Sequence, residues 1–241
     1  MAIDYTKNMS GVDTQSNIDA GLKSYFLGIY AYMAGALAVT GIVAYLFAGF
    51  MQTQGFMSFL QSAPWIQYVI AFAPLAYLFI VGGRMMKMSL ANAQLAFWTF
   101  AIIMGVSLSY IFLAYTSESI AKSFFITAGT FGFMSLYGYT TKRDLSKMGS
   151  FLMMGVIGII IASVVNIFLA SSALSFAISM IAVVCFTGLM AWDTQKLKRL
   201  YFEVSHDAVM LKKVAITGAL SLYLDVINLF VHLLHLLGDR R

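Results

Sequence analysis

Asp225 is the acidic residue whose position most strongly suggests a function. The chain contains only 10 Asp and Glu residues, and most of them lie in polar segments, whereas Asp225 lies inside an apolar stretch. It is expected about 15 Å below the membrane boundary, near the bilayer centre. An ionised Asp at that depth costs about 2.5–3.5 kcal/mol. The residue therefore either serves a function in contact with protein or water, or, when protonated, joins two helices by a hydrogen bond.

The residues around Asp225 extend its polar character along one face of a helix. Spacings of three and four residues place the small and polar side chains on a single stripe, while the other faces are nearly all apolar. The stripe consists of Gly218, Ser221, Asp225, Asn228, His232 and His235. Such a stripe indicates a helix that faces a bundle interior or an aqueous path. Two roles stay open for the histidines, which either relay protons or anchor the helix at the interface.

A second carboxylate, Asp193, ends the preceding apolar stretch within the segment AWDTQ (191–195). Its position alone is compatible with an ordinary carboxylate in water. If the two stretches pack side by side, however, Asp193 comes close to Asp225. Two carboxylates that share one site cannot both ionise cheaply, so the pair is expected to titrate as a unit. Arg84, which follows the second apolar stretch, is either a counter-ion for the pair or an interfacial arginine that extends to the membrane surface.

The elements that must position these residues are membrane-spanning helices. Of the 241 residues, 61% are hydrophobic and 10% are charged. Soluble proteins carry about 25% charged residues, and disordered chains combine low hydrophobicity with high net charge, so both classes are excluded. A span needs roughly 20 mainly apolar residues. The stretches that meet this requirement are 25–50, 65–83, 90–115, 120–140, 149–170, 175–192 and 216–237.

These stretches predict an all-α integral membrane protein with a bundle of seven transmembrane helices. Without a linker or an internal repeat, the chain is expected to have a cytoplasmic N-terminal tail over residues 1–23 and a single transmembrane domain over residues 24–241. A rather long charged loop, 196–213, is expected before the last span. Small residues in the spans either let helices approach closely or are simply tolerated there. Examples are Gly35, Gly129, Gly132, Gly155 and Gly158.

The distribution of Lys and Arg predicts the orientation in the membrane. Of the 15 basic residues, all but Lys122, Arg240 and Arg241 precede the first stretch or follow the second, fourth and sixth, on the side of the N-terminus. Because cytoplasmic loops carry an excess of Lys and Arg, the N-terminus is expected in the cytoplasm. The net charge of +5 therefore reflects topology, and no nucleic-acid partner is expected.

Neither a cofactor nor an enzymatic activity is predicted. The single cysteine, Cys185, has no second Cys with which to form a disulfide or a zinc site. Two intramembrane aspartates also occur in membrane aspartyl proteases, but Tyr-Leu precedes Asp225 where those enzymes have Gly-x-Gly. A serine protease would join Ser107 to His232, but Ser107 lacks the following Gly that is typical of a membrane serine nucleophile.

Two segments carry a resemblance to a known family. Residues 188–197 (GLMAWDTQKL) and 218–230 (GALSLYLDVINLF) resemble the signatures of the transmembrane Bax inhibitor motif family, also called the Bax inhibitor-1 family. Trp192 stands where Tyr is usual in that family. The resemblance implies a bundle in which the other six helices surround the last one. It also implies a bacterial member, in the cytoplasmic (inner) membrane, because the tail lacks the proline-rich extension of some animal relatives.

The same resemblance implies a pH-sensitive calcium leak that is gated by a hydrogen-bonded aspartate pair. Asp193 and Asp225 take these positions here and would be weak Ca²⁺ ligands, while Arg84 matches the family arginine by position only. Ser221, Asn228 and His232 are then expected to line the path. The alternative is a membrane-embedded regulator that binds a membrane protease or a cell-death factor, with the tail 2–21 as a possible contact. The expected partners are calcium, the lipid bilayer and, in the alternative, a membrane protein.

Overall fold

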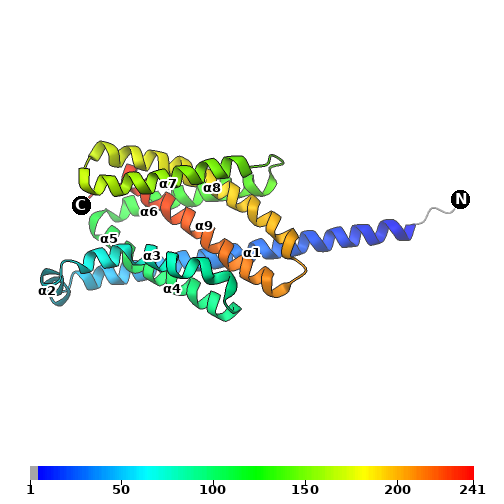
Figure 1. The fold of residues 1–241 in the computed structure, drawn as a ribbon, viewed down its shortest axis with the longest axis horizontal. Helices are drawn as coiled ribbons and strands as arrows, with labels where there is room; N and C mark the ends of the chain where they lie inside the picture. Colours follow the sequence, from blue (N-terminus) through cyan, green and yellow to red (C-terminus); the bar gives the residue numbers. More distant parts are fainter. Residues whose placement is uncertain (1–4) are drawn as a thin grey trace.

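The chain forms a bundle of α-helices, as the apolar stretches predict. A computed structural model describes the backbone of residues 5–241 and the side chains of residues 19–241. Within that part the chain forms no β-sheet, only an isolated bridge between Tyr115 and Arg240. The helices are α1 (Tyr5–Met51), α2 (Gln54–Ser62), α3 (Ile66–Val81), the 3-10 helix η1 (Gly82–Lys87), α4 (Leu90–Leu108), α5 (Tyr110–Ala114), α6 (Ser117–Thr140), α7 (Ser146–Leu169), α8 (Ser172–Val204) and α9 (Ala208–Leu237). Figure 1 shows α9 crossing between the other helices and the start of α1 extending beyond them.

Six segments are long and apolar enough to cross a membrane, so the protein is a multi-pass membrane protein. They are Asp19–Met51, Ile66–Lys87, Leu90–Ala114, Ser146–Leu169, Ser172–Val204 and Ala208–Leu237. Each overlaps one of the predicted stretches. The remaining stretch, 120–140, lies in α6, which has 24 residues but is less apolar because it contains Glu118, Lys122 and several Ser, Thr and Gly residues. Six spans are therefore shown, and the seventh predicted span stays a proposal.

The segment between α8 and α9 differs from the prediction. Instead of a long charged loop over 196–213, α8 continues to Val204 and α9 begins at Ala208. Asp207 caps α9, since its carboxylate accepts hydrogen bonds from the backbone N–H groups of Met210 and Val209 at 3.0 and 2.9 Å. These hydrogen bonds hold the pKa of Asp207 below its ordinary value. The two helices thus form a long hairpin with a short turn and a charged end.

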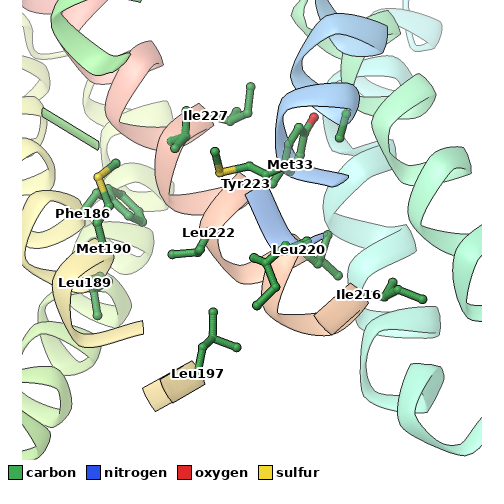
Figure 2. Packing of buried hydrophobic residues seen from close by; sticks show 14 of the residues in the cluster. Met33, Phe186, Leu189, Met190, Leu197, Ile216, Leu220, Leu222, Tyr223 and Ile227 are labelled. Atoms are coloured by element: carbon green, nitrogen blue, oxygen red, sulfur yellow. The ribbon is translucent and has the colours of Figure 1, made fainter. Parts of the chain in front are cut away.

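Helix α9 lies at the centre of the bundle. It packs against α1, α4, α6, α8 and η1, whereas α3 packs mainly on α4, and α7 on α8. The expectation that all six other helices surround the last one is therefore wrong for α3 and α7, which form an outer layer. Leu222 and Tyr223 of α9 are fully buried. Figure 2 shows Met33 of α1 on one side of α9, and Phe186 and Met190 of α8 on the other.

A hydroxyl network ties α9 to α1 and α4. Thr40 Oγ1 donates a hydrogen bond to the carbonyl oxygen of Ala101 at 2.9 Å, and it lies 2.7 Å from the hydroxyl oxygen of Tyr223. Because Thr40 has only one hydroxyl proton, the Tyr223 hydroxyl must donate to Thr40. All three residues are buried. A fully satisfied polar network in an apolar core orients its members uniquely, so this one sets the rotation of α9 against α1.

Glycines allow two pairs of helix backbones to approach closely. A Cβ atom at Gly138 of α6 would overlap the backbone of Ala191 on α8, so no larger side chain fits without movement of the backbone. A Cβ atom at Gly105 of α4 would lie 2.8 Å from the carbonyl oxygen of Thr40 on α1. Small residues thus serve helix packing here, as is common in membrane bundles.

The glycines singled out from the sequence divide into two groups. A Cβ atom at Gly35 would lie 2.9 Å from the ring of Trp98, and one at Gly155 would lie 2.8 Å from the sulfur of Cys185, so these two are packing positions. The packing interpretation is wrong for the others, which have no atom of a neighbouring helix close by. These are Gly129, Gly132 and Gly158. The spacing of glycines along a helix does not reveal which side of that helix meets a neighbour.

Replacement of Gly138 by Ala is expected to destabilise the bundle. The added methyl group would meet the backbone of Ala191, and overpacking of this kind costs about 1–3 kcal/mol. Thermal unfolding of the purified protein in detergent measures the effect. Gly132→Ala on the same helix is the matched control, because its methyl group enters open space and should leave the unfolding temperature nearly unchanged. Equal unfolding temperatures for the two variants would contradict the close approach of α6 and α8.

Candidate functional site

Asp193 and Asp225 meet at the interface between α8 and α9. Their exposed fractions are 8% and 6%, and each carboxyl group is close enough to act on the ionisation of the other. Within the described part of the chain, no two helices share a more extensive contact than α8 and α9. The structure therefore brings together the two acids that the sequence singled out, and it does so inside the protein and away from lipid.

A hydrogen bond between these carboxyl groups requires a proton. Ionised carboxylates only accept hydrogen bonds, so one member of the pair must be protonated to donate. Among the described side chains, no hydroxyl, amide or cationic group donates to Oδ2 of Asp225. A buried carboxylate without a donor is costly, and a shared proton removes part of that cost. In this arrangement the pair holds one proton and can release it.

Lys196 is the cation whose charge acts on Asp193. It follows Asp193 by about one turn of α8, and its Nζ lies 4.9 Å from the ring centre of Trp192 in a cation–π contact. The indole of Trp192 covers Gly149 of α7, where any side chain would overlap the ring. Trp192 thus contacts both a cation and a neighbouring helix beside the pair.

Arg84 is not paired with either aspartate. Its side chain is exposed in η1, and the salt bridge found among the described residues joins Arg199 to Asp144. Helix η1 packs on α9 near Thr217, roughly two helical turns, or about 12 Å, from Asp225. In this arrangement Arg84 thus makes no salt bridge with Asp193, and its role as a counter-ion stays a prediction.

The two residues after Asp193 hold α8 in place through contacts that the sequence analysis did not identify. Thr194 Oγ1 donates to the carbonyl oxygen of Met190 at 2.8 Å and lies 3.3 Å from the hydroxyl of Ser135 on α6. Ser135 in turn lies 2.5 Å from the Tyr30 hydroxyl on α1. This chain of hydroxyl groups connects three helices directly beside the aspartate pair. Three polar residues in a row, Asp193, Thr194 and Gln195, could have indicated these contacts. Adjacent residues of a helix point in different directions, so each of the three can reach a different neighbour.

Gln195 anchors the loop between α6 and α7. Its Oε1 accepts a hydrogen bond from the Leu145 N–H at 2.9 Å, and its Nε2 donates to the carbonyl oxygen of Arg143 at 2.7 Å. In the same loop, hydrogen bonds from Ser146 and the charge of Arg199 hold the pKa of Asp144 below its ordinary value. Asp144 therefore stays ionised at physiological pH, which excludes it as a proton-sensing group in this region.

Much of the polar stripe on α9 faces α8. Gly218 packs against Leu197, where a larger side chain would overlap the leucine. Asn228 donates to the carbonyl oxygen of Leu224 at 2.8 Å within its own helix, and Ser221 is partly buried. The stripe thus forms much of the helix interface in this arrangement. Asp225 is the buried acidic group of the stripe, and it could face water only if the two helices moved apart.

The two histidines of the stripe differ in their surroundings. His232 Nδ1 lies 3.3 Å from the hydroxyl oxygen of Ser179, and its ring stacks on Phe186 with the ring centres 6.3 Å apart. His235 is exposed near the C-terminus. The hydroxyl of Ser107 donates to the carbonyl oxygen of Ala71, so the structure does not join Ser107 to His232.

The described residues do not form a closed metal cage. No group of three or more His, Cys, Asp or Glu side chains comes together among them. Ca²⁺ takes 6–8 oxygen ligands, whereas two carboxyl groups supply at most about four. The pair can therefore hold and release a proton and, once ionised, attract a cation weakly.

Comparison with known proteins places the chain in a family. Residues 22–241 match the family described as inhibitor of apoptosis-promoting Bax1. An uncharacterized protein of Rickettsia prowazekii is 48% identical, with 99% of each chain covered. The inner membrane protein YbhL of Escherichia coli is 43% identical, with 92% of this chain and 94% of that protein covered. An uncharacterized membrane protein of Streptococcus pyogenes is 35% identical, with 93% and 96% covered.

The match covers the first membrane-crossing segment from its fourth residue, Leu22, onward and the other five in full, including both signature segments and the aspartate pair. With nearly full coverage of both chains, these similarities extend to the whole architecture and not only to the two motifs. The chain belongs to the Bax inhibitor-1 family.

Proposed function

We propose that this protein is a pH-sensitive calcium leak in a bacterial cytoplasmic membrane, with Asp193 and Asp225 as its gate. The supporting observation is that these two carboxyl groups are both buried and act on each other where the two most extensively packed helices meet. The proposed topology has seven spans, including α6, with the N-terminus in the cytoplasm. The excess of Lys and Arg on the side of the N-terminus supports this orientation.

The pH response follows from the shared proton. While the pair holds its proton, the hydrogen bond keeps α8 against α9 and the path is closed. As the pH rises through the titration of the pair, the proton leaves and two adjacent negative charges repel each other in a medium of low dielectric constant. Lys196 offsets only part of this repulsion. The helices then separate, so the leak is expected to increase with rising pH.

Separation of α8 and α9 would also expose ligands for the ion. The ionised carboxylates and the amide oxygen of Asn228 supply oxygen atoms, which Ca²⁺ prefers. Ser221 and His232 lie on the same stripe and would line the remaining path. Few ligands mean weak binding, and weak binding suits conduction because the ion must leave as readily as it enters.

Asp193→Asn and Asp225→Asn are each expected to abolish the pH dependence of Ca²⁺ flux. An amide donates a hydrogen bond to the remaining carboxylate without a titrating proton, so the helices stay together at every pH. The measurement is dye-reported Ca²⁺ flux in proteoliposomes across the physiological pH range. Asp144→Asn is the matched control, because Asp144 is exposed and ionised throughout that range. A wild-type pH profile in both pair variants would contradict the gate.

Lys196→Gln and Arg84→Gln separate the two candidate cations. Removal of Lys196 takes away a charge that favours the ionised pair, so the midpoint of the flux–pH curve should move to higher pH. Arg84→Gln tests the counter-ion role that the family resemblance implies, and it should have the smaller effect because Arg84 lies at another level of the bundle. The same flux assay measures both variants. A larger shift for Arg84→Gln would mean that this arginine reaches the pair during opening.

A second candidate function is regulation of a membrane-protein partner. The start of helix α1 extends beyond the other helices (Figure 1), and we propose this extension as the contact for another protein. The predicted contact segment 2–21 begins outside the described residues, which start at residue 5. Deletion of residues 2–20 should abolish capture of a membrane-anchored ATP-dependent protease and leave Ca²⁺ flux intact. Unchanged capture in a pull-down from membranes would exclude this role for the segment.

A further inference from the structure

An apolar slot opens between α1 and α6, on the side of α9 away from the aspartate pair. Its volume is 380 Å³. Its floor is formed by Val226, Ile227 and Phe230 of α9. The slot is closed at one end, where the ring of Tyr30 packs on Phe131 with the ring centres 5.8 Å apart.

Near Phe131, contacts of Tyr30 join α1 to α6. The Tyr30 hydroxyl also lies 2.5 Å from Ser135, which draws α1 and α6 together at that level. Taken as a whole, α1 and α6 do not form an extensive contact, and the slot lies between them. The lining runs along α6 from Ser117 to Phe131, about 21 Å at the rise of an α-helix. One leaflet contributes about 15 Å of hydrocarbon, so the slot is deep enough for one acyl chain.

The lining selects hydrocarbon over water or ions. Three hydroxyl residues occur in the walls, and two of them are already satisfied by backbone carbonyl groups. Thr40 donates to Ala101 and Thr127 donates to Ser123. The third, Ser117, lies at the open end. Apolar cavities without polar partners exclude water. In a membrane, hydrocarbon chains are the solvent that fills such a slot.

The open end carries positive charge at the level of a lipid headgroup. An Arg241 guanidinium N–H donates to Ser117 Oγ at 3.2 Å, and the Arg241 backbone N–H donates to the carbonyl oxygen of Ala114 at 3.0 Å. The Asp239 N–H donates to Ser119 Oγ at 2.9 Å, so the segment 239–241 is held across the end of the slot. The basic side chains at this end of the bundle are those of Lys122, Arg240 and Arg241, and the acidic side chains are those of Glu118 and Asp239.

The geometry points to a binding site for an anionic phospholipid, with one acyl chain in the slot between α1 and α6 and its phosphate at Arg241. This site does not depend on the calcium leak, because it lies on the opposite face of α9 and contains neither aspartate. It does touch the same helix, since Val226 and Ile227 directly follow Asp225 in the sequence. A bound chain would therefore brace α9 against α1 and α6.

Two glycines of α1 supply a matched test. Gly41 lines the slot and Gly49 does not, and at both positions an added side chain meets open space. Gly41→Phe should fill the slot and reduce retention of phosphatidylglycerol at least tenfold, whereas Gly49→Phe should retain it as the wild type does. Native mass spectrometry of the detergent-purified full chain, with added phosphatidylglycerol or phosphatidylcholine, measures retention. Equal retention by the two variants would overturn the proposal.

Two more variants test the acyl-chain and headgroup assignments separately. Ala128→Phe blocks the slot from the α6 wall, so loss of lipid must recur there even if Gly41→Phe fails to fold. Arg241→Gln should reduce retention of phosphatidylglycerol by about fivefold, as expected for one basic residue near a membrane surface. Retention of phosphatidylcholine should not change. If Arg241→Gln affects neither lipid, or both equally, the headgroup assignment is wrong. If Ala128→Phe retains phosphatidylglycerol, the acyl-chain assignment is wrong.

Discussion

Two carboxyl groups that face each other inside an apolar bundle cannot both ionise without cost, and neither can be left there unpaired. Asp193 and Asp225 can reduce this cost by sharing one proton, and they do so where their two helices are closely packed. The surrounding groups reinforce the contact. Thr194 and Gln195 hold α8 against α6 and the loop after it, and Lys196 supplies a single nearby cation. A change in the protonation of the aspartate pair therefore acts on a helix, α8, that these contacts hold in place.

Because α9 is central, a movement of α9 caused by protonation of the pair would also affect its contacts with other helices. On one face α9 meets α8 through the aspartates and His232, and on another it meets α1 and α4 through Tyr223 and Thr40. Movement of α9 away from α8 would strain the Tyr223–Thr40 hydrogen bond, because both groups are buried and have no water to replace it. The pair at the α8 face and the hydroxyl network at the α1 face are thus mechanically linked by one helix.

The two faces of α9 also separate two kinds of chemistry. Much of the polar stripe faces α8, and the residues that follow Asp225 face an apolar slot in which the Thr40 and Thr127 hydroxyl groups donate to backbone carbonyl groups. An ion path requires polar ligands and water, and a lipid chain requires their absence. One helix can serve both because side chains at neighbouring positions point in different directions.

Composition and helical periodicity were enough to predict an α-helical membrane protein, the positions of its apolar stretches, the unusual depth of Asp225 and the stripe around it. These properties depend on local sequence, since a span needs a continuous apolar run and a face needs a repeat of three or four residues. Only the tertiary structure decided which helix meets that face. It brought Asp193 to Asp225, left Arg84 at another level, and separated contact glycines such as Gly155 from Gly158, which faces open space. The reason is physical: a helical repeat specifies which residues share a side, but the packing of all helices together determines the level, rotation and neighbour of that side.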